Sequence, residues 1–199
     1  MKNKYSLAAA VLIGGRSVRM GRPKEDIVIE GDGRTFLDRL CDEVDMCIDR
    51  QIAGRYLSIR KGQEAERTGY KNIADLYDDI GPLGGIISVL GAAKKEGYDG
   101  VLVLACDMIC YTSKEIESIC ASYNGEDILW ARTEGKDLQP LASIYGVGIL
   151  EVAVKHAEKG IYRLSRLDTG AVNTGFYDSA DPSAYDNINS PSRVSRKNT

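Results

Sequence analysis

The feature that most constrains the fold is an uninterrupted apolar run from Leu7 to Ile13, which ends at Gly14 and Gly15. Apolar residues without polar alternation are typical of a strand that is covered on both faces, as in a parallel sheet. Parallel strands must be joined by crossover segments, which are usually helices. The chain has 199 residues, enough for one sizeable α/β domain with its own core.

Strand and helix patterns alternate along the rest of the chain. Strands are predicted at Leu7 to Ile13 and within 27–34, 50–54, 70–74, 100–105, 127–132, 138–146 and 171–177. Apolar residues at helical spacing predict helices at Leu37 to Ile48, Leu83 to about Lys95, Lys114 to Ala121 and Val147 to Glu158. This alternation predicts an α/β protein, a three-layer α/β/α sandwich on a mostly parallel sheet. We expect a single domain over 1–199, with the last six or so residues frayed.

The loop after the first apolar run combines glycines with positive charge. Gly14 and Gly15 leave backbone N–H groups free to point at an anion, and Arg16, Arg19 and Lys24 could neutralise a triphosphate or pyrophosphate. The residues fit neither G-x-x-x-x-G-K-[ST] nor a G-x-G-x-x-G that opens into a helix. A solvated basic turn is the alternative interpretation.

Three further motifs carry candidate chemistry. Asp107 follows the strongest strand pattern, where a carboxylate could hold Mg²⁺ together with phosphate oxygens and water; a turn aspartate is the alternative. The stretch "DLYDDIGPLGG" (75–85) joins an acidic turn to a glycine-rich helix start. The small residues at this helix start could let a ligand approach the backbone closely. A loop with ordinary turn chemistry is the alternative. Asn187 and Asn189 would share one face of an extended segment.

Charge and cysteine content exclude several classes of function. The net charge of −3 argues against a nucleic-acid partner, because nucleic-acid-binding proteins usually carry a basic surface. The five cysteines lack metal-site spacing and indicate small buried side chains in a reducing compartment. No apolar run approaches the roughly 18–20 residues of a membrane span. We therefore expect a cytoplasmic protein without membrane or nucleic-acid partners. The single histidine, His156, is expected at a helix end.

Together these motifs resemble a known family. "VLIGGRSVRMGRPK" resembles the L-x-G-G-x-S-x-R-M-G-x-x-K signature of nucleotidyltransferases. The blocks "DLYDDIGPLGGIISVL", "VLVLACDMI", "QPLASIYG" and "FYDSADPSAYDNINSP" follow in the order of the molybdenum cofactor guanylyltransferase (MobA) family. The resemblance spans about residues 7 to 191. It implies a Rossmann-like nucleotidyltransferase fold and transfer of GMP from GTP to molybdopterin-type molybdenum cofactor, with Mg²⁺, giving molybdopterin guanine dinucleotide and pyrophosphate.

The resemblance also implies roles for individual residues. Arg19, Lys24 and Asp107 match catalytic positions, and Asp107 also matches the Mg²⁺ ligand. Asn187 and Asn189 match the pair on the acceptor side. The nucleotide-binding positions are Leu12, Ile13, Gly14, Gly15, Ser17, Lys24, Asp75 and Asp107. Expected partners are GTP, the molybdopterin cofactor and, transiently, proteins that deliver or accept the cofactor.

Three other functions compete with the one that the resemblance implies. A related nucleotidyltransferase could use CTP or another phosphorylated small-molecule acceptor. A dinucleotide-dependent oxidoreductase would need G-x-G-x-x-G and an acidic residue about 20 positions later, which the glycine pattern does not supply. The presence of both Lys24 and Asp107 argues against a binding protein that has lost catalysis, which an activity assay would exclude.

Overall fold

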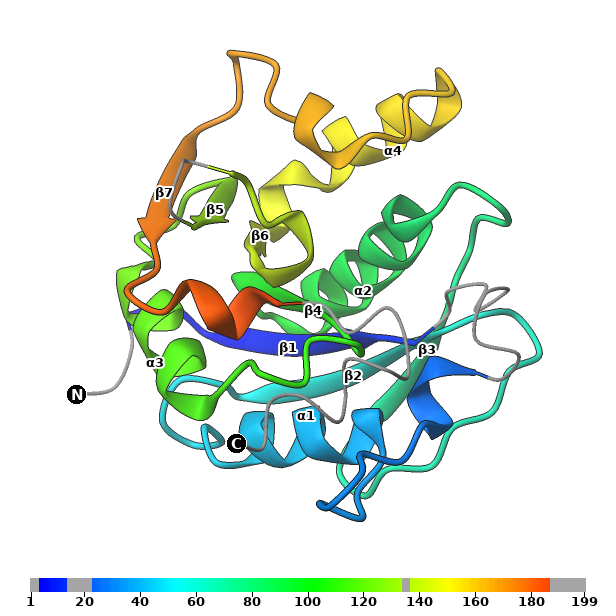
Figure 1. The fold of residues 1–199 in the computed structure, drawn as a ribbon. Coiled ribbons are helices and arrows are strands. Elements are labelled where there is room, and N and C mark those ends of the chain that lie inside the picture. The colour runs from blue at the N-terminus through cyan, green and yellow to red at the C-terminus, as the bar shows by residue number, and fades with distance from the viewer. Residues whose placement is uncertain (1–3, 14–22, 134–136, 187–199) are drawn as a thin grey trace.

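A seven-stranded sheet forms the centre of the protein (Figure 1). The computed structural model describes residues 4–13, 23–133 and 137–186. The strands lie in the order β3-β2-β1-β4-β6-β5-β7. Their bounds are β1 Leu7–Leu12, β2 Gly54–Ile59, β3 Lys71–Ala74, β4 Gly100–Ala105, β5 Ile128–Arg132, β6 Ile144–Gly146 and β7 Thr174–Asp178.

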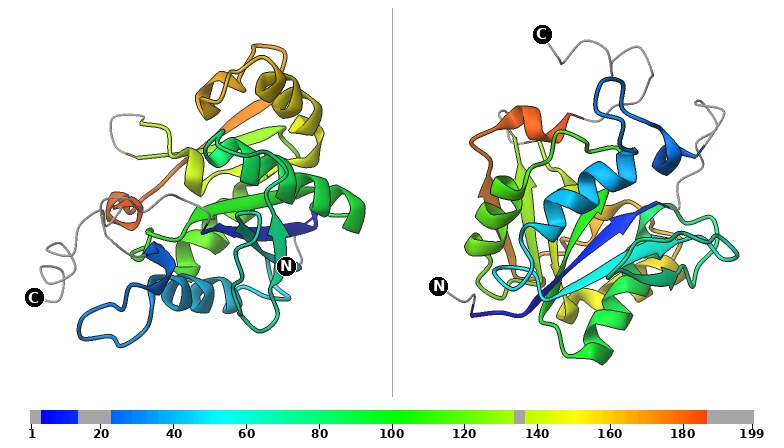
Figure 2. Two further views of the ribbon diagram at one scale, coloured as in Figure 1. Left: turned by 90° about the vertical axis from the view of Figure 1, so that its right-hand side faces the viewer. Right: turned by 90° about the horizontal axis from the view of Figure 1, so that it is seen from below.

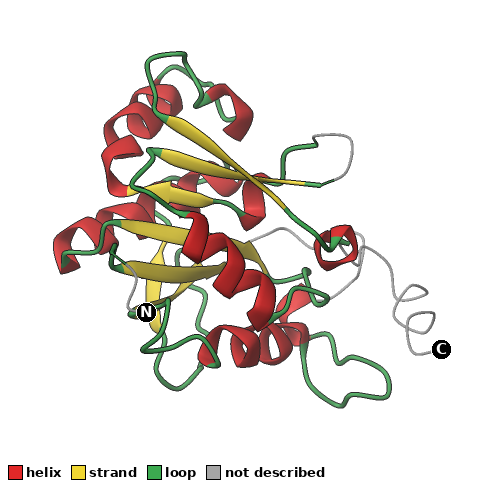
Figure 3. Cartoon of the chain, turned by 90° about the vertical axis from the view of Figure 1, so that its left-hand side faces the viewer, coloured by secondary structure: helices red, strands yellow, loops and turns green. Residues whose placement is uncertain are grey.

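Helices cover both faces of the sheet, as Figures 2 and 3 show. The bounds are α1 Phe36–Asp45, α2 Pro82–Glu96, α3 Ser113–Ser122 and α4 Leu150–Glu158. Alternate residues of β1 point to opposite faces. Ala9 and Val11 join the core beneath α1 and α3, whereas Ala8 and Ala10 join the core beneath α2 and α4. The protein is therefore the three-layer α/β/α sandwich expected from the sequence.

The direction of the chain across the sheet reverses beside β1. From β1 the chain moves outward to β2 and β3, then returns through α2 to β4 on the other side of β1, and these strands are parallel. β6 is antiparallel to both β4 and β5, and β7 is parallel to β5. In sheets of this kind, ligands bind at the carboxyl ends of the strands next to such a reversal. We therefore expect a ligand-binding site at the carboxyl ends of β1 and β4.

Most predicted elements are confirmed, and three predicted strands are wrong in part. The segment 50–54 contributes only Gly54 to a strand, since β2 is the following "GRYLSI". Within 138–146, Pro140 begins a 3-10 turn and only the last three residues form β6, because proline lacks the N–H that a ladder needs. Residues 27–34 form a turn closed by a single bridge between Val28 and Thr35.

The start of α3 departs from a full capping box. Thr112 Oγ1 accepts the backbone N–H of Glu115 at 3.4 Å, as the "TSKE" motif predicts. The Glu115 carboxylate instead accepts the hydroxyl of Tyr185 at 2.7 Å. Tyr185 also packs edge-on against Tyr111, with ring centroids 5.3 Å apart. These contacts fix the end of the described chain against α3.

A glycine inside α2 gives a first prediction. A Cβ added at Gly91 would meet no heavy atom within 4 Å. Because alanine loses less backbone entropy in a helix, Gly91→Ala should raise the free energy of unfolding by about 0.5–1 kcal/mol in urea titrations. As a control, Gly146→Ala should lower it, since that Cβ would lie 2.6 Å from the Glu126 carbonyl oxygen. An unchanged or lower stability of Gly91→Ala would contradict the prediction.

Candidate functional site

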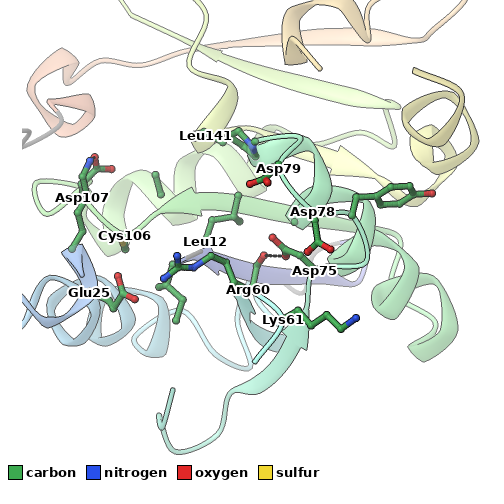
Figure 4. Close-up of a pocket in the computed structure, with 18 residues that line it drawn as sticks. Leu12, Glu25, Arg60, Lys61, Asp75, Asp78, Asp79, Cys106, Asp107 and Leu141 are labelled. Carbon is green, nitrogen blue, oxygen red and sulfur yellow. Dashed lines mark hydrogen bonds and ion pairs between the residues drawn. The ribbon is translucent and has the colours of Figure 1, made fainter. Parts of the chain in front are cut away.

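A cleft of about 1020 Å³ opens at the carboxyl ends of β1, β2 and β4 (Figure 4). Five of the predicted site residues line it: Leu12, Ile13, Lys24, Asp75 and Asp107. Segments far apart in the sequence thus meet at one place. The other predicted positions, Gly14, Gly15, Ser17, Arg19, Asn187 and Asn189, fall outside the described residues.

An ion pair marks one end of the cleft. Lys24 Nζ lies 2.6 Å from Asp107 Oδ2, although 83 residues separate them in sequence. Lys24 opens the short 3-10 turn Lys24–Asp26, and Asp107 follows β4. Both side chains are mostly buried, with exposed fractions of 27% for Lys24 and 11% for Asp107. A charged pair that lines a cleft offers a cation for phosphate and a carboxylate for a metal ion.

The register of the sheet sets the floor of the cleft. Leu12, the last residue of β1, pairs with Ser58 of β2 on one side and with Ala105 of β4 on the other. The backbone continues this alignment, because Ile13 N donates to Ser58 O at 3.1 Å and Cys106 N to Leu12 O at 3.3 Å. The floor is therefore apolar in its centre, with polar groups at either side.

Asp75 marks the opposite end of the cleft (Figure 4). Its Oδ1 accepts the hydroxyl of Ser58 at 2.9 Å, and its backbone N–H donates to Ile59 O at 2.8 Å. Burial raises the pKa of Asp75, and nearby Asp78 adds to the rise, while the Ser58 hydrogen bond opposes it. Ser58 gave no signal in the sequence, because a serine within a strand has no pattern of its own.

Charged residues that the sequence did not single out line the wall between these ends. Arg60 and Lys61 follow β2 and add two cations to the lining. Glu25, next to Lys24, is a buried carboxyl whose pKa burial raises. It accepts Gln63 Nε2 at 2.6 Å, which ties the turn that carries Lys24 to the loop after β2.

The donor set fits a magnesium ion that arrives with a nucleotide. Asp107 offers one hard carboxylate oxygen donor inside the cleft. No group of three or more His, Cys, Asp or Glu side chains suited to a metal occurs among the described residues. Mg²⁺ commonly binds through one or two carboxylates plus substrate phosphates and water rather than in an all-protein cage. The Asp107 carboxylate, with the Lys24 cation beside it, is compatible with that chemistry.

Comparison with known proteins identifies the family. The model of the MobA-like NTP transferase domain matches residues 9–172. The chain belongs to this family. It is therefore a MobA-like nucleotidyltransferase, and the matched range contains both Lys24 and Asp107. The dinucleotide-dependent oxidoreductase considered above is thereby set aside.

Individual relatives agree with the family assignment. A protein of Opitutus terrae named "Probable molybdenum cofactor guanylyltransferase" is 28% identical over 167 residues, covering 82% of this chain and 78% of that protein. A protein of the same name from Rhodopirellula baltica is 26% identical over 172 residues, covering 80% of this chain and 79% of that protein.

Solved structures share the fold of this MobA-like protein. Molybdopterin-guanine dinucleotide biosynthesis protein A of Archaeoglobus fulgidus superposes with a TM-score of 0.74 at 20% identity, covering 95% of each chain. The 4-diphosphocytidyl-2C-methyl-D-erythritol synthase of Anaerococcus prevotii gives 0.68 at 13% identity, covering 96% of this chain and 93% of that one. At these identities the likeness shows the fold alone. The names of the two proteins refer to different nucleotides, so the shared fold does not specify the nucleotide.

Two further observations concern membrane-spanning helices and the cysteines of this MobA-like protein. None of the helices in the described part of the chain has the length and apolar character of a membrane span. In the described part of the chain, the five cysteines form no disulfide, and four of them are buried. Cys106 lines the cleft, and burial raises the pKa of its thiol, which favours the protonated form.

Proposed function

We propose that this protein transfers GMP from GTP to a molybdopterin-type molybdenum cofactor, releasing pyrophosphate and forming molybdopterin guanine dinucleotide. The observation that carries the proposal is the Lys24–Asp107 pair in a cleft at the sheet reversal of a MobA-like chain. The relatives named above as guanylyltransferases support this donor and acceptor. A location in the cytoplasm, with its reducing conditions, agrees with described cysteines that form no disulfide.

The chemistry requires positioning and charge neutralisation rather than a protein nucleophile. A terminal phosphate oxygen of the acceptor attacks the α-phosphorus in line, the bond to the β,γ-diphosphate breaks, and pyrophosphate leaves. We assign to Lys24 the stabilisation of negative charge that grows on the leaving pyrophosphate. Arg19, in the predicted phosphate loop, would share this role.

Asp107 would hold the metal ion of the reaction. Mg²⁺ held by this carboxylate would supply positive charge to neutralise the phosphates. Asp107 supplies the carboxylate ligand, and its present partner Lys24 is then available to the phosphates. Asp75 would line the nucleoside end of the cleft, and Leu12 and Ile13 would form the floor beneath the nucleotide. Gly14, Gly15 and Ser17 remain proposed phosphate-loop contacts, and Asn187 and Asn189 remain proposed acceptor contacts.

Thermal unfolding with nucleotides tests the choice of donor. A ligand that binds only the folded state raises stability by RT ln(1 + [L]/Kd). In the presence of Mg²⁺ we therefore expect GTP at 100 times its Kd to add about 2.7 kcal/mol, and CTP at the same concentration to add much less. A larger shift with CTP would favour the cytidylyl alternative, which the fold shared with the Anaerococcus prevotii enzyme keeps open.

The acceptor is tested by product analysis. Incubation with molybdopterin and each of the four nucleoside triphosphates should release pyrophosphate and form the dinucleotide with GTP alone. Pyrophosphate release that is independent of molybdopterin, or that needs another phosphorylated acceptor, would contradict the proposed acceptor. Binding without turnover would support the binding-protein alternative.

A further inference from the structure

Ser58 is a buried serine at the nucleoside end of the cleft that no motif predicts. Its exposed fraction is 1%, and its hydroxyl donates to Asp75 Oδ1 at 2.9 Å. Ser58 lies near the end of β2, opposite Leu12 of β1, while Asp75 directly follows β3. A buried hydroxyl that donates its hydrogen bond to a carboxylate in the cleft is placed to act through that carboxylate.

The first turn of α2 leaves no freedom for this hydrogen bond to rearrange. A Cβ added at Gly85 would lie 2.5 Å from Ser58 Oγ and 3.3 Å from Asp75 Oδ1. The backbone beside Asp75 is also fixed, since Leu76 N donates to Ser88 Oγ at 2.9 Å. Position 85 is therefore compatible only with glycine while Ser58 and Asp75 remain paired.

The charges of the cleft assign its two ends to different parts of a nucleotide. Asp107 lies at one end and Asp75 at the other, with Leu12 between them (Figure 4). Lys24 lies 2.6 Å from Asp107 and so belongs to the same end. Phosphates at the Lys24 end place the nucleoside toward Asp75. Apolar surface from Leu12, Tyr77 and Pro82 lines the same cleft and suits the face of a base.

We propose that Ser58 is a positioning residue that orients the Asp75 carboxylate to accept N–H donors from guanine. This deepens the proposed function and rests on it. Guanine presents two adjacent donors, N1–H and the N2 amino group, to a single carboxylate. Cytosine presents only its N4 amino group beside the acceptors N3 and O2, which a carboxylate repels. With Ser58 holding Oδ1, the same carboxylate selects guanine over cytosine.

Replacement of Ser58 by alanine tests the proposal in the full-length protein with Mg²⁺. Calorimetric titration should show GTP affinity falling about tenfold, the scale of a hydrogen bond that serves a charged group. Inosine triphosphate lacks the N2 amino group, so the preference for GTP over it should shrink. KM for GTP should rise while kcat is retained, since the reacting phosphorus lies at the other end of the cleft.

Ser143→Ala is the matched control. Ser143 is also buried, directly before β6, and its hydroxyl accepts Ala131 N–H at 3.0 Å and donates to Gln139 O at 2.8 Å. It is not among the residues that line the cleft. This variant loses a buried hydroxyl without touching Asp75, so its preference among GTP, inosine triphosphate and CTP should equal that of the wild type.

A second pair of variants separates positioning from loss of folding. Gly85→Ala should weaken GTP binding, because its Cβ displaces Ser58 Oγ. In the Ser58→Ala background the same change should cost little more, since the displaced atom is absent. Asp75→Asn should move preference from GTP to xanthosine triphosphate, because the amide N–H can donate to the xanthine 2-oxygen where the carboxylate accepted from guanine.

The pH dependence of GTP affinity distinguishes a positioning role of Ser58 from a purely structural one, which would leave this dependence unchanged. Binding requires ionised Asp75, so GTP affinity should fall as the pH drops through its raised pKa. Removing the Ser58 hydrogen bond raises that pKa further, so in Ser58→Ala the fall should begin at a higher pH. Asp78 acts in the same direction in both proteins, and Arg60 and Lys61 line the same cleft unchanged.

The possible failures are distinguishable. Wild-type protein that binds no guanine nucleotide would overturn the proposed function itself. Wild-type protein that prefers GTP, with an unchanged preference in Ser58→Ala and Gly85→Ala, would overturn only the role of Ser58. Equal affinity for GTP and inosine triphosphate combined with weak binding of 2′-deoxy-GTP would also overturn the inference, because it would place Asp75 on the ribose.

Discussion

Lys24→Ala and Asp107→Ala should each lower turnover by about 10²-fold or more, the scale on which single electrostatic groups act in catalysis. Lys24 is the cation that we assign to the leaving pyrophosphate, and Asp107 is the carboxylate that we assign to the metal ion. Their contact at 2.6 Å shows that both side chains already reach the same point of the cleft. Pyrophosphate release with GTP, Mg²⁺ and molybdopterin measures the effect.

A control variant and the double variant test whether Lys24 and Asp107 act together. Lys155→Ala removes an exposed lysine from α4, which is not among the elements that line the cleft, and should leave turnover unchanged. Groups that act as a unit are strongly non-additive, so the double variant should lose little more than either single one. Rates near wild type in either single variant would overturn the assignment of both roles.

The sequence predicts the frame of the molecule because long apolar runs have few alternatives. The run at 100–105 became β4 with unchanged bounds. Gly97 ends α2 in the left-handed conformation, with φ of 82°, as its place after the helical pattern suggests. Segments with mixed character were predicted less well. Ile52 is buried yet lies before β2, since burial alone does not specify an extended strand.

A site residue that comes after a strong strand pattern could be predicted from the sequence. A site residue whose place depends on the register between strands could not. Asp107 could be predicted because it lies two residues after the end of β4. Ser58 could not, since its role depends on the alignment of β2 with β1 and on the glycine of α2 above it. The positions of Glu25 and Arg60 in the cleft could not be predicted either, because they depend on contacts between separate segments of the chain.

A second large effect is expected at Arg67, in the loop between β2 and β3. Its guanidinium reaches three carboxylates on one face of α1: Asp38 at 3.1 Å, Asp42 at 2.6 Å and Asp45 at 2.9 Å. Positions i, i+4 and i+7 share a helix face, so removal of Arg67 leaves like charges side by side. Exposed ion pairs contribute about 0–1 kcal/mol, whereas breaking a buried one costs about 3–5 kcal/mol. For this half-buried network, Arg67→Ala should lower the free energy of unfolding by about 2 kcal/mol.

Denaturant titrations at several pH values distinguish this network from a general packing effect. Burial alone would raise the pKa of Asp42, but hydrogen bonds from Arg34 and Arg67 hold it below its ordinary value of 3.8. A depressed carboxyl pKa adds stability above the unfolded-state value and loses it as the pH falls through the folded value. The gap between wild type and Arg67→Ala should therefore be full at pH 7 and shrink below about pH 4. Arg50→Ala, which breaks one exposed pair with Glu117, should change stability by less than about 0.5 kcal/mol. A gap for Arg67→Ala that is independent of pH would assign its effect to lost packing of the side chain instead of to the three carboxylates.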